Sequence, residues 1–254
     1  MNKNVILIGS LQTRKQQQMA LEIIEKKKYS VIADITSGLR FLNHKFMDHT
    51  RNFSKYDLSK AEKIGGRLVC VPFFKYKKNP KTKTVSKIIS KTDWKEYDLF
   101  LGNSLPIREM DIFAVAGKNY PLVGSNRGAS GIDGIISTAC GFSLGINKGL
   151  ILYLGDMTFL HDINGLSLLK DTKNHMIIVV LNNGGNGIFS ELPIKNDKLF
   201  FEKFFFAPHS YSLSSACSVY NIKHVESSLN NFEKSYLKVI NTKITTVIEI
   251  KTSI

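Results

Sequence analysis

Residues 150–185 read LILYLGDMTFLHDINGLSLLKDTKNHMIIVVLNNGG and decide the fold of this 254-residue chain. Two apolar runs, Leu150–Gly155 and Met176–Leu181, have the length and composition of buried strands. Between them, His161–Leu169 is typical of a helix. A strand, a helix and a second strand in this order predict parallel pairing with a right-handed crossover.

The same alternation extends in both directions. Asn4–Gly9 (NVILIG) and Ser30–Asp34 (SVIAD) are short β-branched runs on either side of a helical stretch. Strands therefore alternate with helices, which predicts an α/β fold with a mostly parallel sheet and flanking helices. The other expected strands are Asp98–Gly102 and Thr245–Ile250, and the other expected helices are Thr13–Lys28, Pro106–Ala116, Ser130–Asn147, Tyr211–Tyr220 and Ser227–Ile240.

The pattern weakens between residues 38 and 95. Residues 73–95, FFKYKKNPKTKTVSKIISKTDWK, are rich in lysine and contain one proline. We interpret this stretch as a solvated, partly mobile linker, with a basic patch for RNA or a protein partner as the alternative. The linker closes an amino-terminal segment, residues 1–95, and a separate domain is expected at residues 96–254.

Charge and cysteine content restrict the class of protein. A formal net charge of +14 and a pI near 9.6 invite a nucleic-acid partner. However, lysine, asparagine and isoleucine are abundant throughout, and anionic substrates would equally suit a positive field. Without a basic motif interleaved with aromatic residues, we do not expect nucleic acid as the partner.

The three cysteines, Cys70, Cys140 and Cys217, form no CxxC pair, which favours a reducing compartment. Cys140 lies among small residues and is expected to fill the core. No apolar run reaches the length of a membrane span, and the first residues resemble a strand more than a signal peptide.

Polar residues follow the two strands that are expected within residues 150–185. Ligands bind at the carboxyl ends of strands in open parallel sheets, and there Asp156 offers a carboxylate and Asn183 an amide oxygen. Gly185 offers a carbonyl that is accessible because glycine lacks a Cβ. Such oxygens suit Mg²⁺, which usually takes one or two carboxylates plus phosphate oxygens. The alternative is an aspartate helix cap and an Asn-Gly turn without a metal.

Gly155-Asp156, followed after one helix and one strand by Asn182-Asn183, is the thiamine-diphosphate motif. Four segments, two of which contain this motif, together resemble the 2-succinyl-5-enolpyruvyl-6-hydroxy-3-cyclohexene-1-carboxylate synthases, the MenD family. Acetolactate synthases and pyruvate decarboxylases share the motif but are less similar. The segments, in order, are GNS at 102–104 with Arg108, the most diagnostic SNRGASGIDG at 125–134, GDMTFLHDINGL at 155–166 and NNGGNGIFSELP at 182–193.

The resemblance implies a cofactor, thiamine diphosphate with Mg²⁺ or Mn²⁺. It implies that Asp156, Asn183 and the Gly185 carbonyl bind the metal. The remaining residues that it assigns to the cofactor are backbone groups of Gly155, Met157 and Thr158 at the diphosphate, Ile132 against its rings, and Ile188 and Phe189 as apolar lining.

The resemblance also implies that 2-oxoglutarate is decarboxylated and added to isochorismate, in menaquinone or phylloquinone biosynthesis. Arg108 and Arg127 would bind the substrate carboxylates, because a guanidinium pairs a carboxylate bidentately, and Ser104 would add a hydrogen bond. Surface ion pairs are the alternative for the two arginines. His161 is expected to be a structural, hydrogen-bonded histidine.

The resemblance is dense from Asp98 to Pro193. Residues 1–40 resemble the opening βαβ unit of that family's central domain, cut short, and no segment resembles its pyrimidine-binding domain. In this enzyme class a neighbouring subunit donates a glutamate from that domain. We therefore expect a homo-oligomer or a complex with a separate pyrimidine-domain polypeptide, in the cytoplasm or the plastid stroma. The alternative is an inactive remnant or a regulatory subunit.

Overall fold

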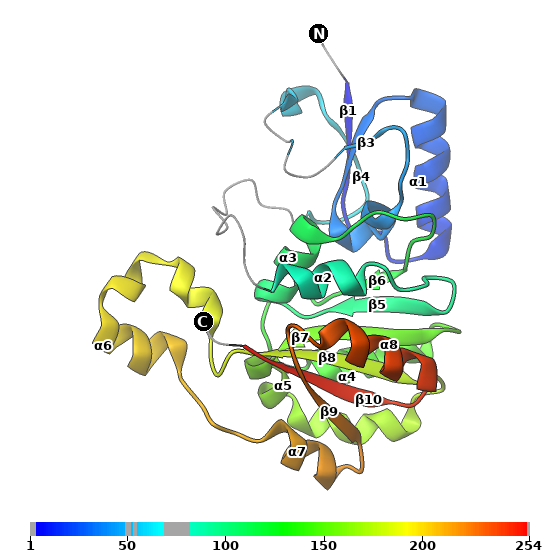
Figure 1. Cartoon of the computed structure of the whole chain (residues 1–254). Coiled ribbons are helices and arrows are strands. Elements are labelled where there is room, and N and C mark those ends of the chain that lie inside the picture. The colour runs from blue at the N-terminus through cyan, green and yellow to red at the C-terminus, as the bar shows by residue number, and fades with distance from the viewer. Residues whose placement is uncertain (1–3, 49–51, 53–54, 69–81, 253–254) are drawn as a thin grey trace.

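The computed structural model describes residues 4–48, 52, 55–68 and 82–252 (Figure 1). They form two sheets, one of four strands in the order β3-β2-β1-β4 and one of six strands in the order β6-β5-β7-β8-β10-β9. Every strand pair within these residues is parallel. The expected α/β fold with a mostly parallel sheet and flanking helices is confirmed.

The smaller sheet contains the βαβ unit expected near the start of the chain. Its helix α1 (Arg14–Lys27) begins with a capping box, in which Thr13 and Gln16 satisfy each other's backbone N–H groups. Ala20 and Ile24 of this helix are buried in the same core cluster as Ile6 and Ile8. The strands are β1 (Val5–Ile8), β2 (Ser30–Ala33), β3 (Met47–Asp48) and β4 (Glu62–Ile64).

The larger sheet is covered by helices on both faces. Its strands are β5 (Tyr97–Leu101), β6 (Val123–Gly124), β7 (Gly149–Gly155), β8 (Met176–Asn182), β9 (Lys223–Ser228) and β10 (Thr246–Lys251). Its helices are α2 (Lys83–Ile89), α3 (Leu105–Phe113), α4 (Ile135–Leu144), α5 (Asp156–His161), α7 (Leu213–Val219) and α8 (Phe232–Thr242).

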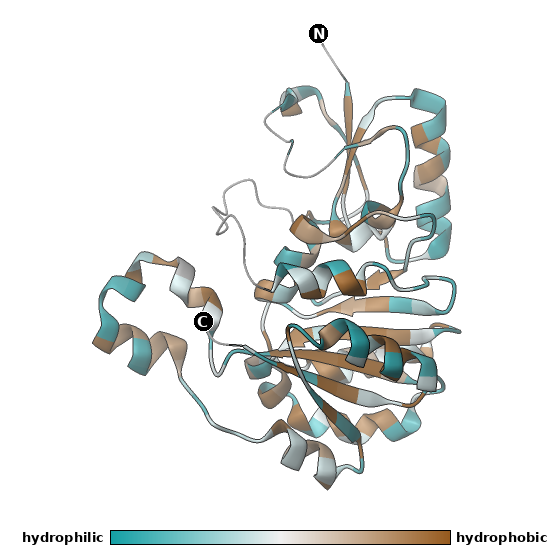
Figure 2. Ribbon diagram, in the orientation of Figure 1, coloured by the Kyte–Doolittle hydropathy of each residue, from teal (hydrophilic) through white to brown (hydrophobic). Residues whose placement is uncertain are grey.

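Successive side chains of β7 and β8 enter two different cores. Ile151 and Ile177 pack in a cluster that includes residues of α2, α3 and α8, whereas Leu152 and Ile178 pack with residues of α4, α5 and α7. Strands buried on both faces have near-continuous apolar sequences. Figure 2 accordingly shows the central strands in brown. Cys140 is buried in the second cluster, as expected.

Two sequence-based interpretations are wrong. The described part of residues 73–95 is packed rather than solvated, since Val85, Ile89 and Trp94 are buried in the core of the larger sheet. The remainder of that stretch, residues 73–81, lies outside the described residues. The stretch Ser227–Ile240, expected as one helix, begins instead with the end of β9, and helix α8 starts at Phe232.

Other elements differ in length. The helix expected at Ser130–Asn147 is α4, which spans a shorter range. In place of a single helix at His161–Leu169, α5 is followed by 3₁₀ turns at Ile163–Asp171. The boundary between residues 95 and 96 stays a prediction, although the packing of α2 groups it with the larger sheet.

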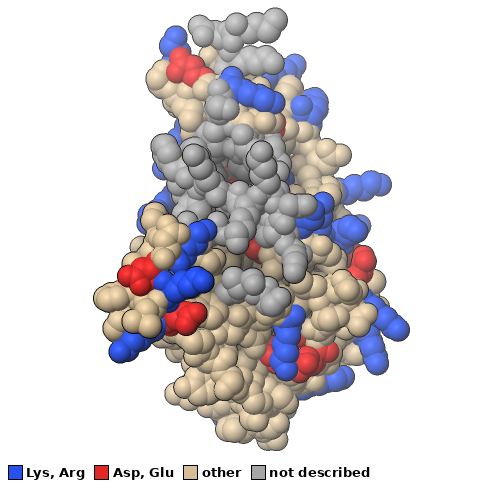
Figure 3. Space-filling model, turned by 60° about the vertical axis from the view of Figure 1, so that its left-hand side comes forward, with Lys and Arg blue, Asp and Glu red and all other residues tan. Residues whose placement is uncertain are grey.

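Polar contacts join the two sheets. Arg14 of α1 forms an ion pair with Asp98 of β5, and the buried Gln17 side chain donates to the carbonyls of Ser37 and Pro121 at 2.9 Å each. Lysine and arginine are scattered over the described surface of the face in Figure 3 and do not form one continuous stripe. Within the described ranges, no helix is both long and apolar enough to cross a membrane.

Candidate cofactor and metal site

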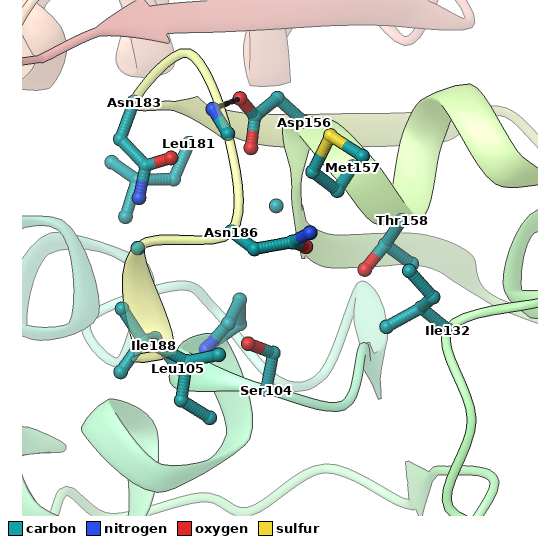
Figure 4. Close-up of a pocket in the computed structure, with 14 residues that line it drawn as sticks. Ser104, Leu105, Ile132, Asp156, Met157, Thr158, Leu181, Asn183, Asn186 and Ile188 are labelled. Carbon is teal, nitrogen blue, oxygen red and sulfur yellow. Dashed lines mark hydrogen bonds between the residues drawn. The ribbon is translucent and has the colours of Figure 1, made fainter. Parts of the chain in front are cut away.

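The carboxyl ends of β7 and β8 face one hollow, shown in Figure 4. Parallel pairing places Gly155 beside Leu181, so Asp156 and Asn183 leave neighbouring strand ends. The hollow is lined by residues of four segments, which are Ser104, Leu105 and Pro106; Ile132; Gly155, Asp156, Met157 and Thr158; and Leu181, Asn183, Gly185, Asn186, Gly187 and Ile188.

Asp156 is the first residue of α5 and is 2% exposed. Its Oδ2 accepts hydrogen bonds from Gly185 N (the dashed line in Figure 4) and from His209 Nε2, both at 2.9 Å. Burial raises the pKa of Asp156, and hydrogen bonds from His209, Met157 and Gly185 oppose that rise. The carboxylate also lies at the end of a helix where negative charge is favoured.

Asn183 supplies a buried oxygen with no hydrogen-bond partner among the described residues. An orphaned buried acceptor costs about 1–3 kcal/mol, and a bound cation would offset that cost. The described residues contain no group of three or more His, Cys, Asp or Glu placed to hold a metal. A cation here would therefore rely on one carboxylate, an amide oxygen, a carbonyl and phosphate oxygens, which is the ligand chemistry of Mg²⁺.

Gly185 is required by a close approach of the chain. Its φ is 158°, and a Cβ at this position would lie 2.5 Å from the carbonyl oxygen of Phe206. The next residue, Asn186, donates its N–H to that same oxygen at 2.7 Å. Phe206 belongs to residues 192–211, which we call the aromatic lobe and which projects from the body of the molecule beside α6 (Lys198–Phe200) in Figure 1.

A polar network connects the glycine-rich loop to strand β10. Gly184 N donates to Asn182 Oδ1 at 3.0 Å, and Asn182 Nδ2 donates to Glu249 Oε1 of β10 at 2.7 Å. The other Glu249 oxygen lies 2.9 Å from His224 Nε2. Burial alone would raise the pKa of Glu249, but the hydrogen bonds from His224 and Asn182 hold it below its usual value.

A second group of side chains adjoins the hollow through Asn103 and Ser104. Arg108 Nη1 donates to the Ser104 carbonyl at 2.6 Å, and Arg127 Nη1 donates to Asn103 Oδ1 at 2.8 Å. Burial lowers the pKa of Arg127, and the charges of Arg108 and Arg67 lower it further. Positive charge is therefore concentrated here, as in sites that bind anions. Ser104 has φ 75° and ψ −136°, which L-residues rarely adopt.

The structure brings most of the sequence-predicted residues together. Ser104, Ile132, Gly155, Asp156, Met157, Thr158, Asn183, Gly185 and Ile188 line the hollow. Arg108 and Arg127 do not line it but contact its neighbours, and Phe189 packs edge-on against Phe205 with ring centroids 5.7 Å apart. His161 is hydrogen-bonded, as expected, to Asp133 at 3.2 Å and lies at the surface.

The sequence alone assigns no role to Asn103, Asn186 or His209, although Asn103 and Asn186 lie in two of the segments that carry the resemblance. Asn103 Nδ2 donates to the carbonyls of Asn126 and Gly131 and so ties two site segments together. Asn186 lies inside the quoted loop and could have been included for its position alone. His209 is 53 residues from Asp156, and no spacing in the sequence connects the two.

The chain is similar in sequence to thiamine pyrophosphate enzymes. The family model described as "Thiamine pyrophosphate enzyme, C-terminal TPP binding domain" matches residues 120–250. A 2-succinyl-5-enolpyruvyl-6-hydroxy-3-cyclohexene-1-carboxylate synthase of Chlorobium limicola is 44% identical over 170 residues, which cover 66% of this chain and 29% of that protein. The synthase of Chlorobaculum tepidum is 39% identical over 195 residues, covering 76% and 33% respectively.

The chain thus spans 29–33% of the length of these two relatives and resembles their carboxyl-terminal part. Among solved structures, the benzoylformate decarboxylase of Polynucleobacter necessarius superposes with a TM-score of 0.66 at 14% identity, over 99% of this chain and 62% of that one. At such low identity the likeness shows the fold alone. Because the family model covers more than half of the sequence, the chain belongs to the thiamine pyrophosphate enzymes and carries their C-terminal TPP-binding domain.

Proposed function

We propose that this chain is the cofactor-binding part of a thiamine-diphosphate-dependent transferase. The reaction is the decarboxylation of 2-oxoglutarate and its addition to isochorismate, in menaquinone or phylloquinone biosynthesis. The cofactor assignment rests on one hollow that is lined by both Asp156 and Asn183. The buried side-chain oxygen of Asn183 has no hydrogen-bond partner among the described residues. The reaction is supported by the similarity to the MenD synthases.

The chain's own residues would bind and orient the cofactor. Bound thiamine diphosphate supplies a carbanion equivalent at its thiazolium ring. The side chains of Asp156 and Asn183, with the Gly185 carbonyl, would hold Mg²⁺ or Mn²⁺. The backbone of Gly155, Met157 and Thr158 would hold the diphosphate, and Ile132 and Ile188 would offer apolar surface to the rings.

Arg108 and Arg127 would bind the substrate carboxylates. Both substrates are dianions, and the charge of Arg108 contributes to lowering the pKa of Arg127. Asn103 orients Arg127 through its 2.8 Å hydrogen bond, and Ser104 offers a hydroxyl at the edge of the hollow. Phe189 packs on Phe205, so in this conformation it supports the loop rather than lining the hollow.

The proposed assembly is a homo-oligomer or a complex with a pyrimidine-domain polypeptide. A glutamate from such a domain would activate the cofactor, and general bases of this kind contribute typically 10²–10⁴-fold to a rate. The absence of a CxxC pair supports a reducing compartment, which we propose to be the cytoplasm or the plastid stroma.

Calorimetry of the full chain with thiamine diphosphate and Mg²⁺ tests the cofactor site. We expect the wild type to bind only when both are present, and Asp156→Ala to lose more than about 100-fold in affinity, because even outer-shell partners of a metal contribute 10–100-fold. Asp57→Ala, which removes an exposed aspartate cap of a 3₁₀ turn, serves as the control. Equal affinity in wild type and Asp156→Ala would exclude this site.

Release of CO₂ from 2-oxoglutarate tests the reaction. We expect release when the chain is mixed with the pyrimidine-binding domain of a MenD synthase, and a loss in Arg127→Met. Cofactor binding without CO₂ release in that mixture would instead favour the inactive remnant or regulatory subunit.

A further inference from the structure

His209 contacts the proposed metal carboxylate from outside the thiamine-diphosphate motif. It follows the aromatic lobe's Phe206, and its side chain is 5% exposed. The backbone N–H of His209 donates to Gly184 O at 3.0 Å, which ties this residue to the glycine-rich loop. The ring is thereby held close to Asp156.

The hydrogen bonds of the His209 ring define which nitrogen carries the proton. Tyr211 N donates to Nδ1 at 3.3 Å, so Nδ1 is an acceptor. Nε2 therefore carries the hydrogen and donates it to Asp156 Oδ2 at 2.9 Å. The ring also stacks on Tyr211, with centroids 5.5 Å apart and an interplanar angle of 18°, which restricts its rotation.

Two residues outside helix α5 donate hydrogen bonds to Asp156, and both bonds reach the same oxygen. Gly185 N and His209 Nε2 converge on Oδ2, and Figure 4 shows the other oxygen turned away from the dashed bond toward the hollow. A carboxylate held by two donors on one oxygen cannot rotate freely, and its second oxygen keeps one direction. Partners of this kind orient the ligands of a metal.

We propose that His209 is a positioning residue for the metal site, and that it directs Asp156 Oδ1 toward the cation. This inference rests on the proposed Mg²⁺–diphosphate function of the hollow. It gives the aromatic lobe a role in that function, because the lobe delivers the histidine.

Titration of the full chain with Mn²⁺ in saturating thiamine diphosphate, followed by electron paramagnetic resonance of free Mn²⁺, tests the proposal. His209→Ala and His209→Phe remove the donor, and we expect each to weaken Mn²⁺ binding 10–100-fold. His209→Gln retains an N–H donor near the position of Nε2, and we expect it to recover most of the affinity.

His44→Ala is a matched control. His44 lies in the unit of the smaller sheet. Its Nε2 is 2.8 Å from Glu25 Oε1, and Phe46 N donates to its Nδ1 at 3.4 Å, so its hydrogen bonds have the same pattern as those of His209. We expect this control to bind Mn²⁺ as the wild type does. A comparable loss in His44→Ala would show that the effect is not specific to Asp156 and would overturn the proposal.

The outcomes separate the two levels of inference. A wild type that binds no Mn²⁺ with thiamine diphosphate overturns the proposed function, and this inference with it. Full affinity in His209→Ala, or a His209→Gln variant as weak as His209→Ala, overturns only the role of His209. A ¹⁵N nuclear magnetic resonance spectrum of histidine-labelled wild type tests the proposal even if His209→Ala does not fold. The His209 signals are those missing from the spectrum of His209→Gln. A proton on Nδ1 rather than on Nε2 of His209 would also overturn the proposal.

Discussion

Glu109 is a carboxyl group buried in helix α3 and only 2% exposed. Its Oε1 accepts a hydrogen bond from Thr82 Oγ1 at 2.6 Å, and its Oε2 accepts one from Tyr153 OH at 3.3 Å. Burial raises the pKa of Glu109 from 4.5 to about 7, despite these two hydrogen bonds. The folded protein therefore holds a proton here that the unfolded chain releases at lower pH.

This proton predicts that stability falls as the pH rises from about 4.5 to about 7. Over that window the folded state binds more protons than the unfolded state, so the free energy of unfolding decreases. The shift from 4.5 to about 7 corresponds to about 3 kcal/mol at about 1.4 kcal/mol for each pKa unit. Glu109→Gln cannot titrate, so its unfolding free energy relative to that of the wild type should rise by about this amount between about pH 4 and about pH 8.

Urea unfolding at several pH values measures the difference between the two proteins. Glu233→Gln, which changes an exposed glutamate on α8, is the control and should follow the wild type. A wild type and a Glu109→Gln variant with parallel pH profiles would contradict a raised pKa at Glu109.

Single site residues can be predicted from the sequence where they directly follow a recognisable strand. Asp156, Asn183 and Gly185 each follow an apolar strand, and the rule that ligands bind at strand ends applies to them directly. His209 carries no such pattern, because its contact with Asp156 depends on the path of the aromatic lobe. The orientation of Arg127 likewise depends on Asn103, 24 residues earlier in the chain.

The glycine-rich loop and the aromatic lobe hold each other in place. Asn186 N donates to Phe206 O at 2.7 Å, and His209 N donates to Gly184 O at 3.0 Å. Gly185→Ala would place a Cβ about 2.5 Å from that Phe206 oxygen, so the two segments must separate. Loss of a buried hydrogen bond costs about 1–3 kcal/mol.

Amide hydrogen exchange measures this separation. We expect the Asn186 amide to exchange about 5- to 150-fold faster in Gly185→Ala, which is the same free energy expressed as a rate ratio. Gly128→Ala is the control, because nothing lies within 4 Å of a Cβ built there. Unchanged exchange in Gly185→Ala would show that the lobe does not depend on this contact.

Whole elements were predictable where their apolar pattern was long. β7 and β8 are buried on both faces and were located within one or two residues. β9 was missed because its sequence KHVESS is mostly polar, as an edge strand permits. Helix α2 was missed because lysines hid the spacing of Val85, Ile88 and Ile89, which is typical of a helix.

Apolar side chains are exposed on the aromatic lobe, which projects from the molecule (Figure 1). Leu199 is 81% exposed, Phe204 59% and Phe200 51%. An exposed cluster of this kind marks an interaction surface or causes association. We therefore expect the isolated chain to self-associate above its monomer mass of 28.6 kDa and to bind hydrophobic dyes.

Sedimentation velocity checks this expectation at the level of the molecule. The double variant Leu199→Lys and Phe200→Ser should sediment as a monomer and bind less dye than the wild type. Leu237→Lys, which alters an exposed leucine on α8, should change neither. A wild type that is already a clean monomer without dye binding would contradict the prediction.

The architecture of two parallel sheets follows from the order of strands and helices, but their junction does not. It depends on Gln17 reaching Ser37 and Pro121, and on the ion pair of Arg14 with Asp98. These contacts join residues up to 104 positions apart and leave no local pattern. The positive net charge likewise did not locate the site, because basic side chains are also scattered over the described surface of the face in Figure 3.

The support of the glycine-rich loop by β10 has a consequence for the order of events during synthesis. Asn182 is held by Glu249 and by the Thr252 N–H, which come 67 and 70 residues later. A ribosome at 5–20 residues per second needs at least several seconds to add that length. Until β10 emerges and docks, the nascent loop lacks these two contacts with Asn182. We therefore expect cofactor binding to distinguish chains in which β10 has docked from chains in which it has not.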